Sequence, residues 1–294
     1  MRAFVALIKR EYLEHKGAFV YGPAILLALM SAGALYAVFG TDFQGDFSNE
    51  LPTVLRFYET AFALSAAAWL AYLIIMEFFY YADAFSSDSR NNSMLFWKSM
   101  PQSDFKIFGA KVGVSLTVFP TAILLATAIT GIIAYLPTVI ASNFLGGFAP
   151  PSLAATAAAW GNIMLTALAL FVIALLWYLP FFAWVGLLGT LFKRWAIPMA
   201  FLIPAAIGLF EKIVIRDNWL EPGAFWAFIS RRFELHFSGL DFEGYWLTGE
   251  PWNGLELLAL MLAGTDWVSL IAGVVVALML MFAASEYRRR YILT

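Results

Sequence analysis

Residues 112–192 read VGVSLTVFPTAILLATAITGIIAYLPTVIASNFLGGFAPPSLAATAAAWGNIMLTALALFVIALLWYLPFFAWVGLLGTLF, without a single Asp, Glu, Lys or Arg. A helix needs about 20 mostly apolar residues to cross a bilayer, and this stretch is far longer than one span. Proline and glycine residues interrupt it between positions 137 and 151, which is typical of a loop. The stretch therefore predicts two spans, at about Lys111–Leu136 and Thr156–Leu191.

The composition of the whole chain also indicates a membrane protein. Hydrophobic residues make up 62% of the 294 residues and charged residues only 13%, whereas about 25% of the residues of a soluble domain are charged. Other uncharged stretches predict further spans at Ala18–Phe39, Thr60–Tyr81, Ala196–Phe210 and Trp267–Ser285. We expect an all-α integral membrane protein, a single transmembrane domain of six transmembrane helices over residues 1–294.

The distribution of basic residues predicts the orientation, because Lys and Arg concentrate in cytoplasmic loops. Six spans place most of the 18 basic residues, and both termini, on the cytoplasmic side. Splitting the fourth span at Pro180 would move Lys193, Arg194 and every later loop to the wrong face. The basic N-terminus could open a signal peptide, but its apolar run is longer than a signal sequence requires. We therefore expect a multi-pass protein of the cell inner (plasma) membrane.

A polar island follows the second span. Residues Asp83–Lys111 read DAFSSDSRNNSMLFWKSMPQSDFKIFGAK, with an apolar patch, Met94–Trp97, between Arg90 and Lys98. A loop that only reverses the chain has no need of Phe96 and Trp97, whereas aromatic anchors supply much of the energy of protein contacts. The island is predicted to bind a soluble partner. The alternative is that both rings rest in the headgroup layer.

Several kinds of chemistry find no support in the sequence. The chain has no P-loop, no H-E-x-x-H and no G-x-S-x-G motif, no Cys, and two distant His residues. We therefore expect no catalytic residue, no metal site and no enzyme activity of its own. Carboxylates inside a bilayer mark ion pathways, but Glu59, Glu77 and Asp266 lie near span ends and are expected to reach water.

The segment 211–266 is rich in aromatic residues interleaved with carboxylates. Since Ala196–Phe210 is short for a span, we expect this segment to form short interfacial or re-entrant helices that close the outer end of a translocation path. Trp219, Phe225 and Trp226 are the candidate gate residues. An ordinary outer loop resting on headgroups is the alternative.

Three segments together resemble those of ABC-2 type ABC transporter permeases: LIKREYLEH near the N-terminus, FFYYADAFSSDSRNNSMLFWKSMPQSD after the second span, and EYRRR near the C-terminus. The resemblance covers essentially the whole chain. It implies a transmembrane subunit that pairs with a second, identical or different, permease subunit and with a cytosolic ABC ATPase subunit. ATP and magnesium would be bound by that ATPase and not by this chain, with membrane lipids as further partners and no nucleic acid.

The resemblance also assigns roles to segments. Residues 1–17 would be an amphipathic elbow helix, with Phe4, Leu7, Ile8, Arg10 and Glu11 as its contact residues. Residues 83–111 would be the cytoplasmic coupling loop, and its coupling helix would dock on the ATPase together with the turn at Lys193 and Arg194. The docking residues in the loop would be Arg90, Asn91, Asn92, Ser93, Met94, Leu95, Phe96, Trp97, Lys98 and Ser99. Related permeases often carry more charge where this chain has Ser86, Ser87, Asn91 and Asn92.

The expected function is ATP-driven export. The uncharged span interiors favour an amphiphilic or lipid-like cargo over a hydrophilic ion. The alternatives are a self-contained secondary transporter or channel, which would show inverted repeats or charged, broken helices, and a membrane-embedded enzyme or sensor.

Overall fold

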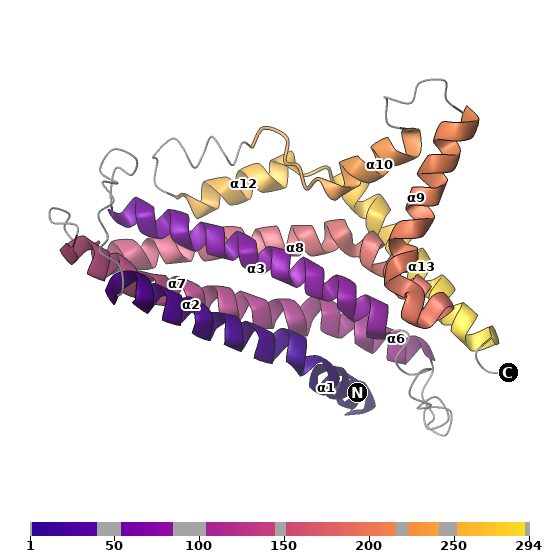
Figure 1. The fold of residues 1–294 in the computed structure, drawn as a ribbon, viewed down its shortest axis with the longest axis horizontal. Helices are drawn as coiled ribbons and strands as arrows, with labels where there is room; N and C mark the ends of the chain where they lie inside the picture. Colours follow the sequence, from indigo (N-terminus) through magenta and orange to yellow (C-terminus); the bar gives the residue numbers. More distant parts are fainter. Residues whose placement is uncertain are drawn as a thin grey trace.

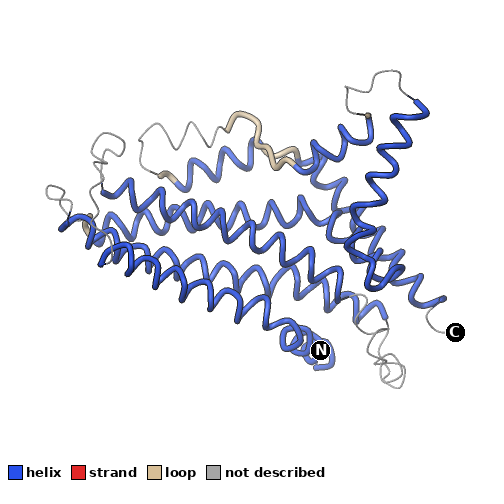
Figure 2. The backbone as a smooth tube through the Cα atoms, in the orientation of Figure 1, coloured by secondary structure: helices blue, strands red, loops and turns tan. Residues whose placement is uncertain are grey.

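The computed structural model describes residues 2–39, 54–84, 104–144, 151–215, 223–240 and 252–291. Within these ranges the chain forms helices and short connections, without a β-strand (Figure 2). The prediction of an all-α fold is therefore confirmed. In chain order the elements are α1 (Arg2–Lys16), η1 (Gly17–Tyr21), α2 (Gly22–Phe39), α3 (Val54–Ala84), α6 (Asp104–Gly113), η2 (Val114–Val118), α7 (Phe119–Phe144), α8 (Leu153–Phe192), η3 (Lys193–Trp195), α9 (Ala196–Ile215), α10 (Ala224–Phe233), α12 (Gly254–Gly264) and α13 (Trp267–Tyr291).

Five apolar segments are long enough to cross a membrane, which makes the chain a multi-pass membrane protein. They are Phe4–Tyr36, Leu55–Ala84, Lys106–Val139, Leu153–Val214 and Trp267–Arg290. The fourth segment contains both α8 and α9, which the sequence predicts as separate spans. The short η3 helix divides it, and α9 stands at a steep angle to α8 in Figure 1. The six-span arrangement stays a prediction.

Helix α8 occupies the centre of the bundle and packs against α3, α7, α9, α12 and α13 (Figure 1). The Ser152 side chain begins this helix by accepting a hydrogen bond from the Ala155 backbone N–H, as an N-cap residue does. Phe171, Leu175 and Phe182 carry its apolar surface into the main core. Pro180 lies inside α8, and the helix continues past it, as the sequence analysis expects.

Two ends of the bundle can be distinguished. At one, which we call the proximal end, lie α1, the last turn of α3, the start of α6, η3 and the last turn of α13 (Figure 1). The opposite end, the distal end, holds the end of α2, the start of α3, the end of α7 and the start of α8 (Figure 1). Helices α2, α3, α7 and α8 therefore run between these two ends, whereas α9 stands at a steep angle to them (Figure 1).

Several predicted boundaries are wrong because a proline or a charge was taken as the end of a helix. Helix α7 continues through Pro137 to Phe144, and α9 continues through the charged Glu211 and Lys212 to Ile215. The predicted loop 83–111 is also too long, since its first two residues belong to α3 and its last eight to α6. A helix of 20 residues such as α9 is about 30 Å long, so the fifth helix is not short.

Candidate functional site

The predicted docking residues in the loop, Arg90 to Ser99, lie outside the described residues, and their role stays a prediction. The structure does describe the two helices from which that segment emerges. Helix α3 ends at Ala84 and α6 begins at Asp104. The candidate site is therefore built from the side chains that hold these two helix ends in place.

A buried ion pair joins α1 to α6. The ammonium of Lys111 lies 2.8 Å from Oε1 of Glu11, and the two residues are 0% and 3% exposed. Taking two charges out of water is costly, and a close ion pair offsets part of that cost. The Glu11–Lys111 pair therefore fixes the position of α1 against α6. The apolar face of α1 alone would not fix that position.

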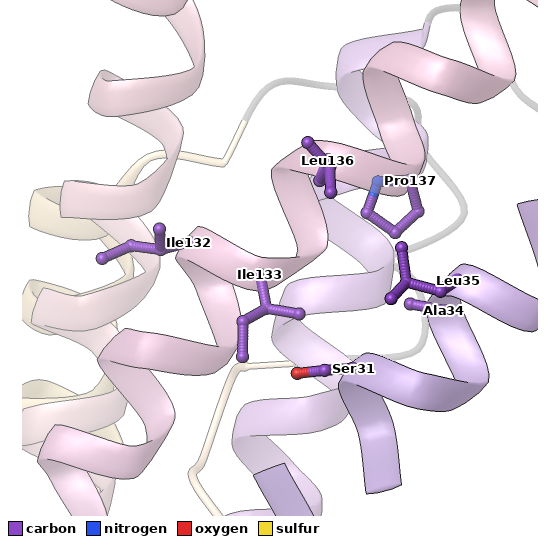
Figure 3. Close-up of a pocket in the computed structure, with 7 residues that line it drawn as sticks. All are labelled: Ser31, Ala34, Leu35, Ile132, Ile133, Leu136 and Pro137. Carbon is purple, nitrogen blue, oxygen red and sulfur yellow. The ribbon is translucent and has the colours of Figure 1, made fainter. Parts of the chain in front are cut away.

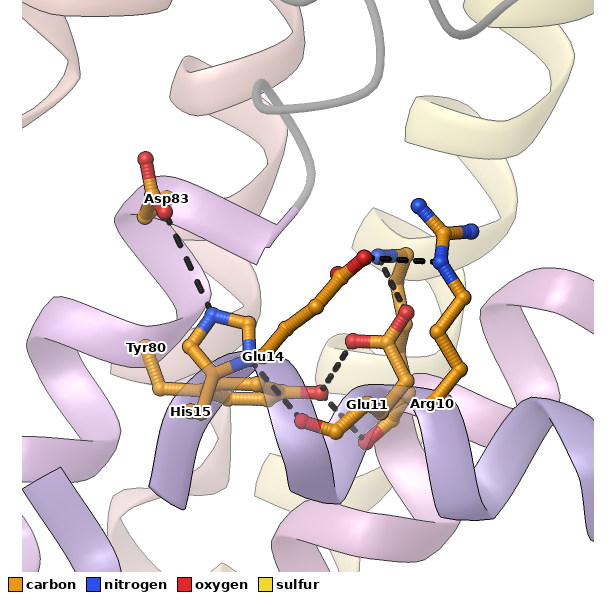
Figure 4. Close-up of polar contacts among 7 residues, drawn as sticks. Arg10, Glu11, Glu14, His15, Tyr80 and Asp83 are labelled. Atoms are coloured by element: carbon orange, nitrogen blue, oxygen red, sulfur yellow. Dashed lines mark hydrogen bonds and ion pairs between the residues drawn. The ribbon is translucent and has the colours of Figure 1, made fainter. Parts of the chain in front are cut away.

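Helix α3 joins this pair through Tyr80. The Tyr80 hydroxyl donates to the backbone carbonyl of Lys111 at 3.1 Å and lies 3.4 Å from Oε2 of Glu11 (Figure 4). The His15 ring packs edge-on against the Tyr80 ring, with 4.7 Å between centroids, and its Nε2 lies 4.0 Å from the Asp83 carboxylate. We call Glu11, His15, Tyr80, Asp83 and Lys111 the proximal cluster.

The apolar stripe of α1 has a partner in the protein. Leu7 is buried against Ile107 and Ala110 of α6, with Ile8 beside them, whereas Phe4 is 41% exposed. Leu7 and Glu11 are four residues apart and so lie on one helical face. Leu7, one of the expected contact residues of the elbow helix, therefore contacts the protein itself, because α6 covers it. The other predicted contact residue, Arg10, pairs with Glu14 at 2.7 Å on the half-exposed side.

Two π-helical turns lie beside the proximal cluster. Phe19 of η1 stacks on Phe119, the first residue after η2, with 3.6 Å between ring centroids and 3° between planes. The Tyr72 hydroxyl donates to the Ala18 carbonyl of η1. Single π turns inside α-helices occur frequently at functional sites. Here they mark the points where α1 passes into α2 and where α6 passes into α7.

The second predicted docking element, Lys193 and Arg194, is an exposed turn between α8 and α9. Lys193 has φ 53°, which makes it the one non-glycine residue with positive φ in the described part of the chain. One turn earlier, a Cβ at Gly189 would lie 2.9 Å from the Ala82 carbonyl oxygen of α3. This close approach places the basic turn near the α3 end from which the docking segment emerges.

The three carboxylates predicted to reach water behave differently from one another. Asp266 is exposed, as expected, and hydrogen bonds from Ser269 lower the pKa of its carboxyl group. Glu59 is buried and pairs with Arg56 at 3.0 Å. Glu77 is completely buried, with a hydrogen bond from Ser115 at 2.7 Å. For Glu59 and Glu77 the expectation is wrong, because neighbouring helices cover both.

The segment 211–266 contains two helices in its described part, α10 and α12. Glu211, at the end of α9, accepts a hydrogen bond from the Ala224 N–H at 2.6 Å and so caps the start of α10. Phe225 is half-buried and Trp226 is 45% exposed, and both come within 4.0 Å of the space above Gly208. The third predicted gate residue, Trp219, lies outside the described residues.

Sequence reasoning missed Arg232, which anchors this segment. Its guanidinium donates to the carbonyl of Ser269 at 2.9 Å and to that of Trp177 at 3.0 Å, and it lies 4.0 Å from the centroid of the Trp177 ring. Burial lowers the pKa of Arg232, although arginine stays protonated in proteins. No local sequence pattern distinguishes Arg232 from its exposed neighbour Arg231, because the partners of Arg232 are distant in sequence. Arg232 thus ties α10 to α8 and α13.

A second anchor lies at the distal end. Glu59 of α3 also accepts a hydrogen bond from the Trp252 backbone N–H at 3.2 Å, and the Trp252 indole donates to Thr166 of α8 at 3.1 Å. Trp252 stands just before α12, which begins with an Asn253–Glu256 capping pair. Helix α3 therefore contacts the proximal cluster at one end and the chain entering α12 at the other.

One group of side chains has the composition of a metal site. Ligand atoms of Glu11, Glu14 and His15 lie within 4.8 Å of one another. However, Glu11 is paired with Lys111 and Glu14 with Arg10. Their geometry is explained by these ion pairs.

An apolar groove of about 320 Å³ lies between α2 and α7 towards the distal end (Figure 3). Its lining is aliphatic apart from Ser31, whose hydroxyl donates to the Leu27 carbonyl at 2.8 Å. The lining residues are Ser31, Ala34, Leu35, Ile132, Ile133, Leu136 and Pro137. Such a surface suits hydrocarbon and offers little to a charged solute.

Comparison of the chain with protein-family models, with curated proteins and with solved structures finds no match.

Proposed function

We propose that this chain is the membrane permease subunit of an ATP-driven ABC exporter, which dimerises and docks a separate ATPase through residues 91–99. One observation supports this proposal most. The two helix ends that flank the docking segment, at Ala84 and Asp104, are joined to each other and to α1 by the buried proximal cluster. A partner that pulls or pushes on the segment between them would move these three helices together.

The length of α3 provides a route for that movement. This helix has 31 residues and so is about 46 Å long at 1.5 Å per residue. Tyr80 attaches it to the proximal cluster, and Glu59 attaches it to the chain just before α12. A tilt of α3 at the proximal end would therefore reach the helices of segment 211–266, which we assign to the outer gate.

The surfaces in the membrane support an amphiphilic or lipid-like cargo. The groove between α2 and α7 is lined by aliphatic side chains, and ordered polar groups that fix a hydrophilic solute are absent from that lining. An acyl chain would be held there by van der Waals packing, because the groove lies within membrane-spanning segments where the surroundings are already apolar. In this proposal the proximal end of the bundle faces the cytoplasm and the distal end faces outward.

A self-contained secondary transporter is the second candidate, and one observation favours it. Glu77 is a fully buried carboxylate inside a membrane-spanning helix, and such residues commonly mark proton or ion pathways. The two candidates differ in their source of energy.

Reconstitution in liposomes distinguishes the ATP-driven exporter from the secondary transporter. We expect a fluorescent phospholipid to move between leaflets only when ATP and the ABC ATPase partner that the proposal requires are both present. Movement driven by a pH gradient, with no ATPase in the membrane, would contradict the exporter and support the secondary transporter. The chain alone, with ATP but no ATPase, is the control for leakage.

A further inference from the structure

Three glutamates are buried in the described part of the chain, and two of them have a cationic partner. Glu11 pairs with Lys111 at 2.8 Å, and Glu59 pairs with Arg56 at 3.0 Å. Glu77 is buried more deeply than either, at 0% exposure, yet no basic group of the described residues lies within ion-pair distance of it. Because all three are buried but only Glu77 lacks a cationic partner, we expect Glu77 to differ in charge from Glu11 and Glu59.

The surroundings of Glu77 come from α3 and η2. Its Oε2 accepts a hydrogen bond from the Ser115 hydroxyl at 2.7 Å, while Oε1 has no hydrogen-bond partner. The Ser115 hydroxyl also lies 3.1 Å from the Tyr81 hydroxyl. Ser115 stands in the π turn η2, which places its hydroxyl against α3.

The charged and titratable groups around Glu77 offer it no compensation. Tyr80 and Tyr81, on its own helix, contribute hydroxyl groups and no positive charge. On α1 the buried acid is Glu11, which has the same charge sign, and on α6 the ammonium of Lys111 lies 2.8 Å from Glu11. On α13, Arg288 lies over the Phe108 ring, 5.5 Å from its centroid.

A buried carboxylate without a cation is strongly disfavoured, and such a group takes up a proton instead. One neutral hydroxyl cannot replace the water that a carboxylate loses on burial, since a carboxylate has about four acceptor sites. A neutral carboxylic acid, in contrast, accepts the Ser115 hydrogen bond and carries no charge. Burying its one O–H donor costs far less than burying an unpaired carboxylate.

We propose that Glu77 is a proton-binding site, at which the carboxyl group between α3 and η2 carries a proton as long as these two elements are in contact. Loss of the proton creates a charge that only water can stabilise, so deprotonation and separation of α3 from η2 occur together. This holds for either source of transport energy, because it depends only on the contact between α3 and η2.

Infrared difference spectroscopy in lipid nanodiscs at neutral pH tests the site directly. We expect the wild type to show the C=O stretching band of a protonated carboxyl group, Glu77→Gln to lose it, and Glu59→Gln to keep it. Glu59 is the matched control, since it is also buried on α3 but is paired with Arg56. Absence of the band in the wild type, or its persistence in Glu77→Gln, would overturn the proposal.

Ser115→Ala provides a test that leaves Glu77 in place. Because this change removes the hydrogen bond to the Glu77 carboxyl group, the band should move to higher frequency while the protein stays folded. An unshifted band would belong to another carboxyl group and would also overturn the assignment. This variant keeps the test decisive if Glu77→Gln fails to fold.

Discussion

Removal of the Glu11 carboxylate should destabilise the protein strongly. In Glu11→Ala, the Lys111 ammonium stays at a position that is 0% exposed and loses the carboxylate 2.8 Å away. Tyr80 keeps its hydrogen bond to the Lys111 carbonyl but not its contact with Oε2 of Glu11. The result is a buried charge whose desolvation is no longer offset by its ion-pair partner.

The expected loss of stability in Glu11→Ala follows from the burial of the Glu11–Lys111 ion pair. Breaking a buried ion pair by removing one partner costs about 3–5 kcal/mol. Surface pairs spaced i,i+4 on a helix contribute about 0.3–0.5 kcal/mol. The neighbouring Arg10–Glu14 pair belongs to the second class, since its side chains are 32% and 37% exposed. Glu14→Ala is therefore a matched control on the same helix.

Thermal unfolding in lipid nanodiscs measures the difference. At about 2–4 °C per kcal/mol, Glu11→Ala should lower the unfolding temperature by on the order of 10 °C and Glu14→Ala by no more than about 2 °C. Adding Lys111→Met to Glu11→Ala should restore most of the loss, because no charge is then left buried. Equal unfolding temperatures for the two single variants would refute this account of the proximal cluster.

Three further predictions concern topology and the outer segment. The chain has no native cysteine. A Cys introduced at position 93 should not react with an impermeant thiol reagent added outside, whereas cysteines at 143 and 248 should react. Labelling at position 93 from outside would contradict the six-span arrangement. Arg232→Met should lower the free energy of unfolding by about 2–4 kcal/mol, because two charge-assisted hydrogen bonds are lost. The exposed Arg231→Met should lower it by under about 0.5 kcal/mol. Equal unfolding temperatures for the two variants would refute the role of Arg232 as an anchor. Cysteines at 226 and 148 joined by a short crosslinker should block export but not ATPase docking, and full export with the crosslink formed would show that the segment is not a moving gate.

The helical membrane fold could be predicted from the sequence because apolar length is a local property. The charge-free stretch 112–192 holds α7 and all of α8, and the predicted break between them is confirmed by the start of α8 at Leu153, behind its Ser152 N-cap. Helix ends were harder to predict. Pro137 and Glu211 look like terminators along the chain, but each lies within a helix that neighbouring helices support.

The polar contacts of the candidate site could not be predicted, because their partners are distant in sequence. Glu11 meets Lys111 across 100 residues, and Glu59 meets Trp252 across 193. Arg56 with Glu59, and Arg10 with Glu14, left local signals, because each pair is three or four residues apart on one helix. The burial of Glu77 likewise depends on η2, a π turn for which no sequence pattern was available.

The most direct test of the central claim is capture of the ATPase. The proposed P-loop ATPase partner should co-purify with the wild-type chain from detergent-solubilised membranes. Phe96→Ala and Trp97→Ala should reduce that capture by at least about 30-fold in affinity, because truncation of an aromatic anchor costs about 2 kcal/mol or more. Phe282→Ala, which alters an exposed ring on α13, should capture the ATPase as the wild type does. Undiminished capture by both loop variants would contradict docking through residues 91–99 and place their rings in the headgroup layer.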